Sequence, residues 1–440
     1  MESKTRRLDW VVFLMLMMSS LVVFQYSGMT FFLLMQILFC VLMVFTKKIV
    51  VISKIPIVNF IFIELVLTAI SAVVGDMRYS YKQSAVIMTI FMIPMYFTAT
   101  YLYNELKKDK NYLKLLVKAI KVMILLQLCW IPLQAVAYYG MGIDLNKLIF
   151  VETLHLLENA TFIRSWVYYP SGFSWHSAVL APLFVIAFVM FDNIFIRALV
   201  LLDAMICGNS TAIIGVAVCV CMMAFFYVKE NGLHKKIKAK TFLAVIALIV
   251  IGGVVLFRFN MWTKVMDSAL YLLNRMFGAE RDASTAAHFG YYSDYPQILK
   301  DSSVFQILFG YGYGCSGYPI TMMYDRYTTI TNWAIESDIL DILISRGMVG
   351  FVGYYGFLFY IAFKGLKVDY RYFVVMVSIM LEGFGYNVQW EYVFFIELLM
   401  YFSLKLNINF FEPVKLIERK KKRSVRFVTR TKKRKCEKEA

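Results

Sequence analysis

Residues 56–74 read PIVNFIFIELVLTAISAVV, and the one ionisable side chain in this stretch is Glu64. A helix of this length is about 28 Å long, close to the roughly 30 Å hydrocarbon core of a bilayer. Similar blocks recur along the 440-residue chain, in which 60% of residues are hydrophobic and 17% are charged. Soluble domains contain about 25% charged residues. The composition therefore excludes a soluble enzyme, a disordered chain and a coiled coil, and continuous apolar blocks argue against a β-barrel.

The apolar blocks predict an all-α polytopic membrane protein with about twelve transmembrane helices. Lys and Arg concentrate in the connections that this arrangement places in the cytoplasm, and both termini are expected on that side. The predicted spans are residues 10–26, 29–45, 56–74, 84–103, 117–138, 175–191, 194–208, 211–228, 241–258, 347–363, 370–386 and 388–404.

Two outer connections are long, and long loops usually carry structure and function of their own. The sequence therefore predicts a first bundle of about nine helices, a large extracytoplasmic loop with short helices, three further spans and a basic cytoplasmic tail. These regions are residues 1–258, which include an outer loop at 139–174, then 259–346, 347–404 and 405–440.

The positive charge is unevenly distributed along the chain. The formal net charge is +17, and residues 405–440 hold fourteen Lys and Arg against four Glu, so this tail supplies +10. Short connections on the same predicted side carry much of the remainder. This distribution is typical of topology signals beside anionic lipid headgroups, so we expect membrane lipids, and no nucleic acid, as partners.

The large loop is aromatic and slightly acidic. Residues 259–337 contain nine Tyr together with Trp262 and Trp333. Aromatic faces beside carboxylates suit sugars, whose C–H faces stack on rings and whose hydroxyls need acceptors. The alternative is that these aromatic side chains form the core of the loop and a belt at the membrane interface.

Residues 164–176 read RSWVYYPSGFSWH and bring Arg164, a Pro/Gly turn and His176 to the start of a predicted span. A guanidinium stays charged and can grip a phosphate through two parallel hydrogen bonds. The alternatives are an arginine that extends to the lipid headgroups and a structural histidine at the interface.

Two further segments lie in the second half of the large loop. Arg281 precedes the glycine run GYGYG at residues 310–314, which allows a tight turn but matches no complete phosphate-binding loop. Residues 336–347 read ESDILDILISRG, in which Asp338 and Asp341 share one helical face. This pattern predicts an amphipathic helix at the outer membrane interface, or a helix with a solvated face.

Acidic side chains also occur within the predicted spans, where ionisable groups are costly and tend to line a cavity or pair with a base. They could relay protons in a transporter or anchor the helix bundle. No cluster of His, Cys and Asp has the spacing of a metal site. The acidic residues are Glu64, Asp203, Glu382, Glu391 and Glu397.

These segments and the predicted topology resemble the O-antigen polymerase (Wzy-type) superfamily of bacterial membrane proteins, which includes O-antigen ligases and capsule polymerases. The shared architecture covers nearly all of the chain. The motifs that carry the resemblance are Arg164 before the turn at 170–172, Arg281 before the segment FGYGYG at 309–314, and Glu336 before the segment GMVG at 347–350.

The resemblance implies a membrane glycosyltransferase that polymerises polyprenyl-diphosphate-linked repeat units on the outer face of the bacterial cytoplasmic membrane, in O-antigen or capsule biosynthesis. A sugar hydroxyl of one unit attacks the anomeric carbon of another, the polyprenyl diphosphate leaves, and no metal or other cofactor is needed. A chain-length regulator is an expected partner. The ligase branch often has a histidine near the position of Glu336, so the glutamate favours a polymerase over a ligase.

The expected site residues follow from the charge that develops on the leaving diphosphate, which prepositioned arginines would stabilise without a metal. Glu336 is the first candidate for the base that activates the acceptor hydroxyl. The candidate diphosphate ligands are Arg164 and Arg281, followed by Arg258 and Arg346, and the further candidates for substrate binding or proton transfer are His176, His288, Asp338 and Tyr311.

Two other functions remain open on the sequence. A flippase or another transporter of lipid-linked oligosaccharides would also need about twelve spans and buried charges. Many transporters are built from repeats, and we see no internal repeat here, which favours the enzyme. A ligase would keep the same chemistry but use a different acceptor.

Overall fold

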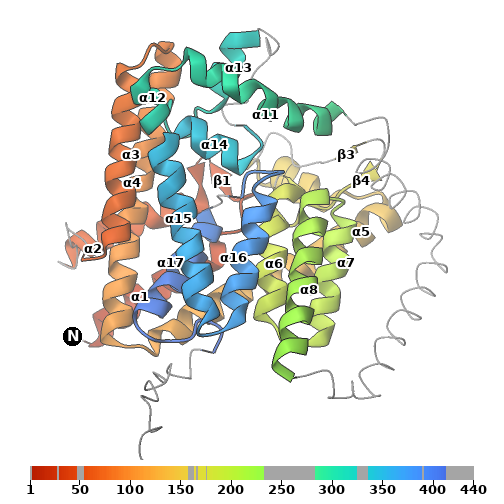
Figure 1. The fold of residues 1–440 in the computed structure, drawn as a ribbon. Helices are drawn as coiled ribbons and strands as arrows, with labels where there is room; N and C mark the ends of the chain where they lie inside the picture. Colours follow the sequence, from red (N-terminus) through yellow and green to blue (C-terminus); the bar gives the residue numbers. More distant parts are fainter. Residues whose placement is uncertain are drawn as a thin grey trace, which may run out of the picture.

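The computed structural model describes residues 2–26, 29–46, 54–156, 163–164, 167–174, 176–231, 283–324, 335–388 and 391–412 (Figure 1). The predicted span at 241–258, the first part of the large loop and the tail beyond residue 412 lie outside the described residues.

The described chain is mostly helical, and its strands form two antiparallel pairs, β1 with β2 and β3 with β4. The elements of the first half are α1 (Glu2–Met18), β1 (Gln25–Tyr26), β2 (Met29–Thr30), α2 (Phe31–Phe45), α3 (Pro56–Val74), α4 (Tyr79–Lys108), α5 (Tyr112–Met141), a π-helix η1 (Lys147–Thr153), β3 (Ile163–Arg164) and β4 (Val167–Tyr168). A 3-10 turn η2 (Ser177–Leu180) leads into α6 (Ala181–Met190), α7 (Ile194–Ile206) and α8 (Ser210–Asn231).

The second half begins with four helices that belong to the predicted large loop: α11 (Ala283–Asp301), α12 (Val304–Phe309), α13 (Gly317–Tyr324) and α14 (Asp338–Ser345). Three helices follow in the described chain, α15 (Gly347–Leu366), α16 (Tyr370–Glu382) and α17 (Glu391–Lys405).

Five of the described helices are long and apolar enough to cross a membrane, namely α3, α4, α5, α8 and α15. Shorter apolar helices occupy residues 8–18, 31–45 and 177–190. The chain is therefore a helical membrane protein by length and composition. The predicted number of twelve spans goes beyond what these helices show.

Two helices form the centre of the bundle. α6 buries all ten of its residues, and α17 buries twelve of its fifteen. A helix that is hydrophobic on every side packs in the core of a protein or faces lipid, and the burial of these two helices places them in the core. Tyr392 of α17 donates a hydrogen bond of 2.6 Å to the carbonyl of Val179 in η2, which ties the two central helices together.

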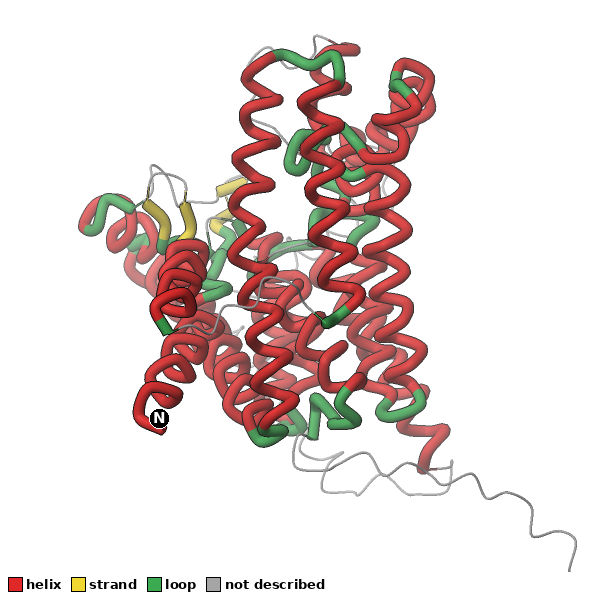
Figure 2. Tube along the Cα trace, turned by 90° about the vertical axis from the view of Figure 1, so that its left-hand side faces the viewer, coloured by secondary structure: helices red, strands yellow, loops and turns green. Residues whose placement is uncertain are grey.

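The helices α11 to α14 form a cap at one end of the bundle, and α12 lies beside the ends of α3 and α4 there (Figures 1 and 2). The N-terminus and the turn between α15 and α16 lie at the opposite end. A second hydrophobic core, separate from that of the bundle, holds this cap in place. Its buried members are Ala72, Met77, Ala85, Ile298, Tyr311, Cys315, Tyr318, Ile320, Ile335, Leu340 and Ile344.

The first predicted span is too long at its carboxyl end. The sequence predicts a helix over residues 10–26, whereas α1 ends at Met18 and a strand occupies residues 25–26. Ser19 ends the helix by donating its side-chain hydroxyl to the carbonyl of Leu16 at 2.7 Å. The backbone of Val23 then donates to the carbonyl of Phe173 at 3.1 Å, so the chain turns toward a different partner.

Two glycines allow α12 to approach the junction of α14 and α15. Gly310 has a φ of +80° and Gly347 a φ of +66°, which L side chains rarely adopt. A Cβ on Gly347 would overlap the backbone of Leu308 and Phe309, and one on Gly310 would overlap that of Ser345. The close approach lets the backbone N–H of Tyr311 reach the carbonyl of Ile344 at 2.8 Å.

We expect Gly347→Ala to lower the free energy of unfolding by more than about 1 kcal/mol, because both the positive φ and the facing backbone oppose a Cβ. The matched control is Gly356→Ala in the same helix, where a Cβ meets no atom within 4 Å. That change should stabilise the protein by about 0.5–1 kcal/mol, as alanine does in helices. Thermal unfolding in detergent, followed by circular dichroism, measures both variants, and equal effects would contradict the close approach.

Candidate functional site

The Pro-Ser-Gly turn at residues 170–172 is a buried structural element. The backbone N–H of Gly172 donates to the side-chain oxygen of Gln134, and that of Phe173 donates to the side-chain oxygen of Gln127, both at 2.8 Å. The side-chain amide of Asn146 donates to the carbonyl of Gly172 at 2.8 Å. These amides satisfy the backbone groups of a turn that is shielded from water, which buried backbone requires.

These three amide side chains were not among the predicted site residues. Gln127 and Gln134 lie seven residues apart in α5, and both are fully buried, as is Asn146. A signal was present in the sequence, because two glutamines on one face of an otherwise apolar predicted span need polar partners. The sequence could not indicate that their partner is the turn before η2.

His176 connects this turn to the cap. Its ring lies parallel to the ring of Tyr386, with centroids 5.8 Å apart and an interplanar angle of 3°. The carbonyl of Tyr386 accepts a hydrogen bond of 3.4 Å from the backbone N–H of Asp338 at the start of α14. The Nδ1 atom of His176 accepts from the backbone of Ala178 at 3.0 Å and so fixes the ring. The segments 164–176 and 336–347, distant in sequence, therefore meet.

The helix α14 is buried on both its apolar and its polar face. Asp338 is fully buried and Asp341 is 9% exposed, so the alternative of a solvated face is wrong. The helix has the predicted polar and apolar faces, and the turn after α16 covers the polar one. Asp338 accepts hydrogen bonds from the hydroxyl of Tyr355 at 3.0 Å and from the backbone of Val388 at 3.3 Å.

Asp341 has a different set of partners. Its carboxylate accepts hydrogen bonds from the hydroxyl of Ser316 and, at 3.4 Å, from the side-chain amide of Asn387. The Ser316 oxygen in turn accepts the backbone N–H of Ile335 at 2.8 Å. Burial raises the pKa of the Asp341 carboxyl to about 6, while Ser316, Arg346 and Asn387 act in the opposite direction. This carboxyl group can therefore exchange a proton near neutral pH.

Arg346 lies at the junction of α14 and α15 and forms a buried, two-pronged ion pair with Glu64 of α3. The Nε–Oε1 distance is 2.9 Å and the Nη2–Oε2 distance is 2.7 Å. The side chains are 8% and 1% exposed, respectively. Glu64 thus occupies two donors of the guanidinium through which we expected Arg346 to bind a diphosphate. The same ion pair holds α3 against the base of the cap.

Tyr311 also holds the cap together. Its hydroxyl lies 2.7 Å from that of Ser302, and its ring is 7% exposed within the second hydrophobic core. The chain around it runs alongside the end of α14. There, the backbone N–H of Gly312 donates to the carbonyl of Ser345 at 2.9 Å. The glycine run and the 336–347 segment are therefore packed together.

Glu336 is the exposed acid of the site. It lies two residues before α14. The pKa of the phenol of Tyr386, in the turn that follows α16, is raised first by burial and then by the negative charge of Glu336. Glu336 and Tyr386 are therefore close enough to interact, and Glu336 is exposed to solvent. A carboxylate in this position can approach a ligand hydroxyl, as a general base must.

The structure leaves four predicted site residues partly or wholly undescribed. Arg164 lies in β3, opposite Val167, but its side chain is outside the described part, and so is that of His288 in α11. Arg258 and Arg281 lie outside the described residues altogether. In the part that is described, no group of three or more His, Cys, Asp or Glu side chains could hold a metal ion.

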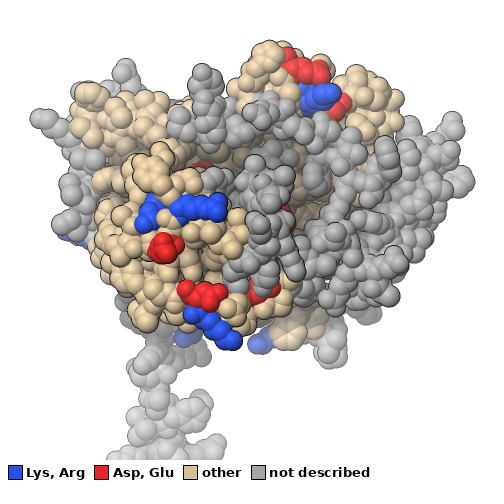
Figure 3. Space-filling model, turned by 90° about the horizontal axis from the view of Figure 1, so that it is seen from above, with Lys and Arg blue, Asp and Glu red and all other residues tan. Residues whose placement is uncertain are grey.

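The described surface of the cap carries small groups of both charges, separated by large areas of other residues (Figure 3).

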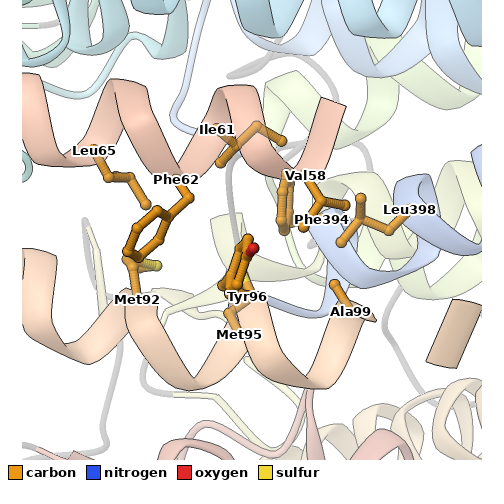
Figure 4. Close-up of a pocket in the computed structure, with 10 residues that line it drawn as sticks. All are labelled: Val58, Ile61, Phe62, Leu65, Met92, Met95, Tyr96, Ala99, Phe394 and Leu398. Atoms are coloured by element: carbon orange, nitrogen blue, oxygen red, sulfur yellow. The ribbon is translucent and has the colours of Figure 1, made fainter. Parts of the chain in front are cut away.

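An apolar slot lies between α3, α4 and α17 (Figure 4). Its volume of about 20 Å³ has room for little more than one water molecule, so a lipid chain could enter only if the helices moved apart. No charged side chain lines it. The lining residues are Val58, Ile61, Phe62, Leu65, Met92, Met95, Tyr96, Ala99, Phe394 and Leu398.

No model of a protein family matches the sequence, and no curated protein matches it either. The resemblance to polysaccharide polymerases therefore remains one of short motifs and topology.

We expect Glu64→Gln to destabilise the protein by about 3–5 kcal/mol, because it leaves the buried guanidinium of Arg346 without its counter-charge. The control is Glu152→Gln, which removes the partner of Lys147 at the protein surface, where the two side chains are 51% and 56% exposed. Surface pairs contribute at most about 1 kcal/mol. Thermal unfolding in detergent gives both values, and a loss for Glu64→Gln no larger than for the control would contradict the pairing.

The raised pKa of Asp341 predicts how stability depends on pH. The folded protein holds this proton up to about pH 6, whereas the unfolded chain releases it near its ordinary value of 3.8, so stability falls as the pH rises between the two. Replacement by Asn removes this loss. The melting temperature of Asp341→Asn relative to wild type should therefore rise from pH 4 to pH 7, and a constant difference would contradict the assignment.

Proposed function

We propose that this chain is a polysaccharide polymerase that joins polyprenyl-diphosphate-linked oligosaccharide repeat units on the outer face of a bacterial cytoplasmic membrane. The observation that carries the proposal is the convergence of three separate motif segments, at 164–176, 310–314 and 336–347, at one end of an apolar helical bundle. A lipid-linked substrate needs such a bundle for its tail and a polar site at the end for its headgroup.

In the proposed reaction, an acceptor hydroxyl attacks the anomeric carbon, the bond to the diphosphate breaks, and the hydroxyl proton passes to a base. Glu336 is the exposed carboxylate whose charge acts on Tyr386, and it takes the role of the base. Arg164 and Arg281 take the role of diphosphate ligands. Asp338 and Arg346 do not contact the substrate in this proposal. They hold the site in position through hydrogen bonds to buried partners, Tyr355 and Glu64 respectively.

The rival from another class is a transporter of lipid-linked oligosaccharides. Two acids within the helices, Asp203 and Glu382, are buried and have no hydrogen-bond partner among the described residues, which is typical of proton-coupled carriers. Purified protein in detergent, given lipid-linked repeat units, separates the two classes. Lengthening of the glycan supports the polymerase, and unchanged glycan length contradicts it.

We expect Arg164→Ala and Arg281→Ala each to slow glycan polymerisation by about 100- to 1000-fold, the usual loss when one donor to a developing negative charge is removed. Gel separation of surface glycans from cells that produce normal amounts of each variant measures the chain length. Lys300→Ala is the matched control, because Lys300 is an exposed cation in α11. Normal chain lengths in both arginine variants would overturn the assignment of these arginines.

A further inference from the structure

Contacts among segments that are distant in sequence form a closed ring. The backbone of Val23 donates to the carbonyl of Phe173 at 3.1 Å, so the hairpin of β1 and β2 lies beside the turn before η2. The last residue of β2, Thr30, donates its hydroxyl to the carboxyl group of Glu391 at 3.3 Å. Glu391 is the first residue of α17, so the hairpin connects the turn to that helix.

Tyr313 of the glycine run lies within reach of charges from several elements. Burial raises the pKa of its phenol, whereas Arg346 acts to lower it, and the carboxyl groups of Asp341 and Glu391 raise it further. These charged side chains belong to α14, to its junction with α15, and to α17. The phenol therefore lies where the cap meets the start of α17.

Two contacts close the ring. The side-chain amide of Asn387 donates to Asp341 at 3.4 Å, and the ring of the neighbouring Tyr386 lies parallel to that of His176. His176 follows the turn from which the ring of contacts starts. The charge of Glu336 also acts on the phenol of Tyr386. The ring therefore passes beside the exposed acid to which we assign the role of base.

The ring contains polar groups that water can reach and that the described protein does not use. The hydroxyl of Tyr313 has no hydrogen-bond partner in the described part of the chain, yet it is not sealed from solvent. For Glu391, Thr30 donates to Oε2, and no described residue donates to Oε1. The half-buried polar members of the ring are Thr30, His176, Tyr313, Tyr386, Asn387 and Glu391.

The charges around the phenol favour an uncharged ligand. Arg346 is neutralised by Glu64, so these two groups together with Asp341 and Glu391 carry no net positive charge, whether or not the last two hold protons. Such a group does not attract a diphosphate, and an apolar chain would leave the hydroxyl and carboxyl groups unsatisfied. Sugar hydroxyls both donate and accept hydrogen bonds, so they pair with a phenol and with a carboxyl group in either protonation state.

We propose that this ring binds a sugar of the lipid-linked repeat unit, with the hydroxyl of Tyr313 donating to a sugar oxygen and the carboxyl group of Glu391 accepting from a sugar hydroxyl. The proposal rests on the polymerase function proposed above. It makes Tyr313 and Glu391 substrate-binding residues and leaves proton transfer to Glu336. It also gives partners to two polar groups that the described protein does not use.

The first test removes one oxygen atom. Tyr313→Phe deletes the hydroxyl, and Tyr295→Phe in α11 is the matched control. Tyr295 is also half-buried in the cap, and its hydroxyl has no partner among the described residues, but its pKa is raised by burial alone, without a charge from the ring. The probe is the lipid-linked repeat unit extracted from cells that lack this protein. Binding to the full-length protein is measured as the rise in melting temperature in detergent.

We expect Tyr313→Phe to need about tenfold more probe for the same rise, which corresponds to the loss of one hydrogen bond to the ligand. Tyr295→Phe should bind the probe as the wild type does, and equal affinity in the two variants would overturn the sugar site. Without probe, Tyr313→Phe should melt as the wild type does. A clear drop would show that the hydroxyl pairs within the protein, and would also overturn the proposal.

The second test concerns the carboxyl group. Glu391→Gln keeps an oxygen for the hydroxyl of Thr30 but places an amide nitrogen, which cannot accept a hydrogen bond, where a sugar hydroxyl would donate. The control is Glu397→Gln in the same helix, because Glu397 is fully buried and accepts from the hydroxyl of Tyr354 at 3.2 Å. We expect about tenfold weaker probe binding in Glu391→Gln alone. Unchanged affinity in that variant, or an equal loss in both, would overturn the proposal.

A probe without sugar identifies the part of the ligand that the ring binds. Polyprenyl diphosphate should act equally on the wild type and on Tyr313→Phe, and a loss of its affinity in the variant would place the diphosphate in the ring and overturn the sugar site. A wild type that the repeat unit does not stabilise would overturn it as well. These assays need no turnover, so they decide this inference separately from the proposed function, which fails if the wild type does not lengthen the glycan.

Discussion

The ion pair between Glu64 and Arg346 joins the two halves of the molecule. Glu64 lies in the middle of α3, in the first half of the sequence, and Arg346 lies where the cap ends and α15 begins. Inside a protein the attraction between such charges is little screened, and a two-pronged guanidinium contact fixes both distance and orientation. The close approach of Gly310 and Gly347 lies at the same junction, because Gly347 follows Arg346 in the chain and Gly310 faces its backbone.

Much of the helical framework could be predicted from the sequence, because the cost of exposing backbone to lipid restricts a long apolar block to a helix. The bounds of α3 coincide with the predicted span, and those of α15 differ by three residues at one end. The end of α1 could not be predicted, because Val23 leaves the helix to bond with Phe173, about 150 residues later in the chain. Non-local pairing of this kind has no local signal.

Three of the segments that the sequence singles out are linked in the structure, but two of their candidate residues have buried partners. The segments around His176, Tyr311 and Glu336 do come together, through Tyr386 and the end of α14. Arg346 and Asp338, however, form hydrogen bonds with buried partners in other helices, Glu64 in α3 and Tyr355 in α15. Periodicity identifies a polar face on α14 but cannot distinguish water from a neighbouring turn as the group that covers it.

The shortness of α6 has a consequence for the chain around it. Together with η2, the helical segment 177–190 extends roughly 23 Å, less than the roughly 30 Å of a hydrocarbon layer. The central helix therefore does not cross such a layer by itself, and non-helical chain must complete the path. The turn at 170–172 is suited to that place, because the side-chain amides of Gln127, Gln134 and Asn146 satisfy backbone groups that lipid could not.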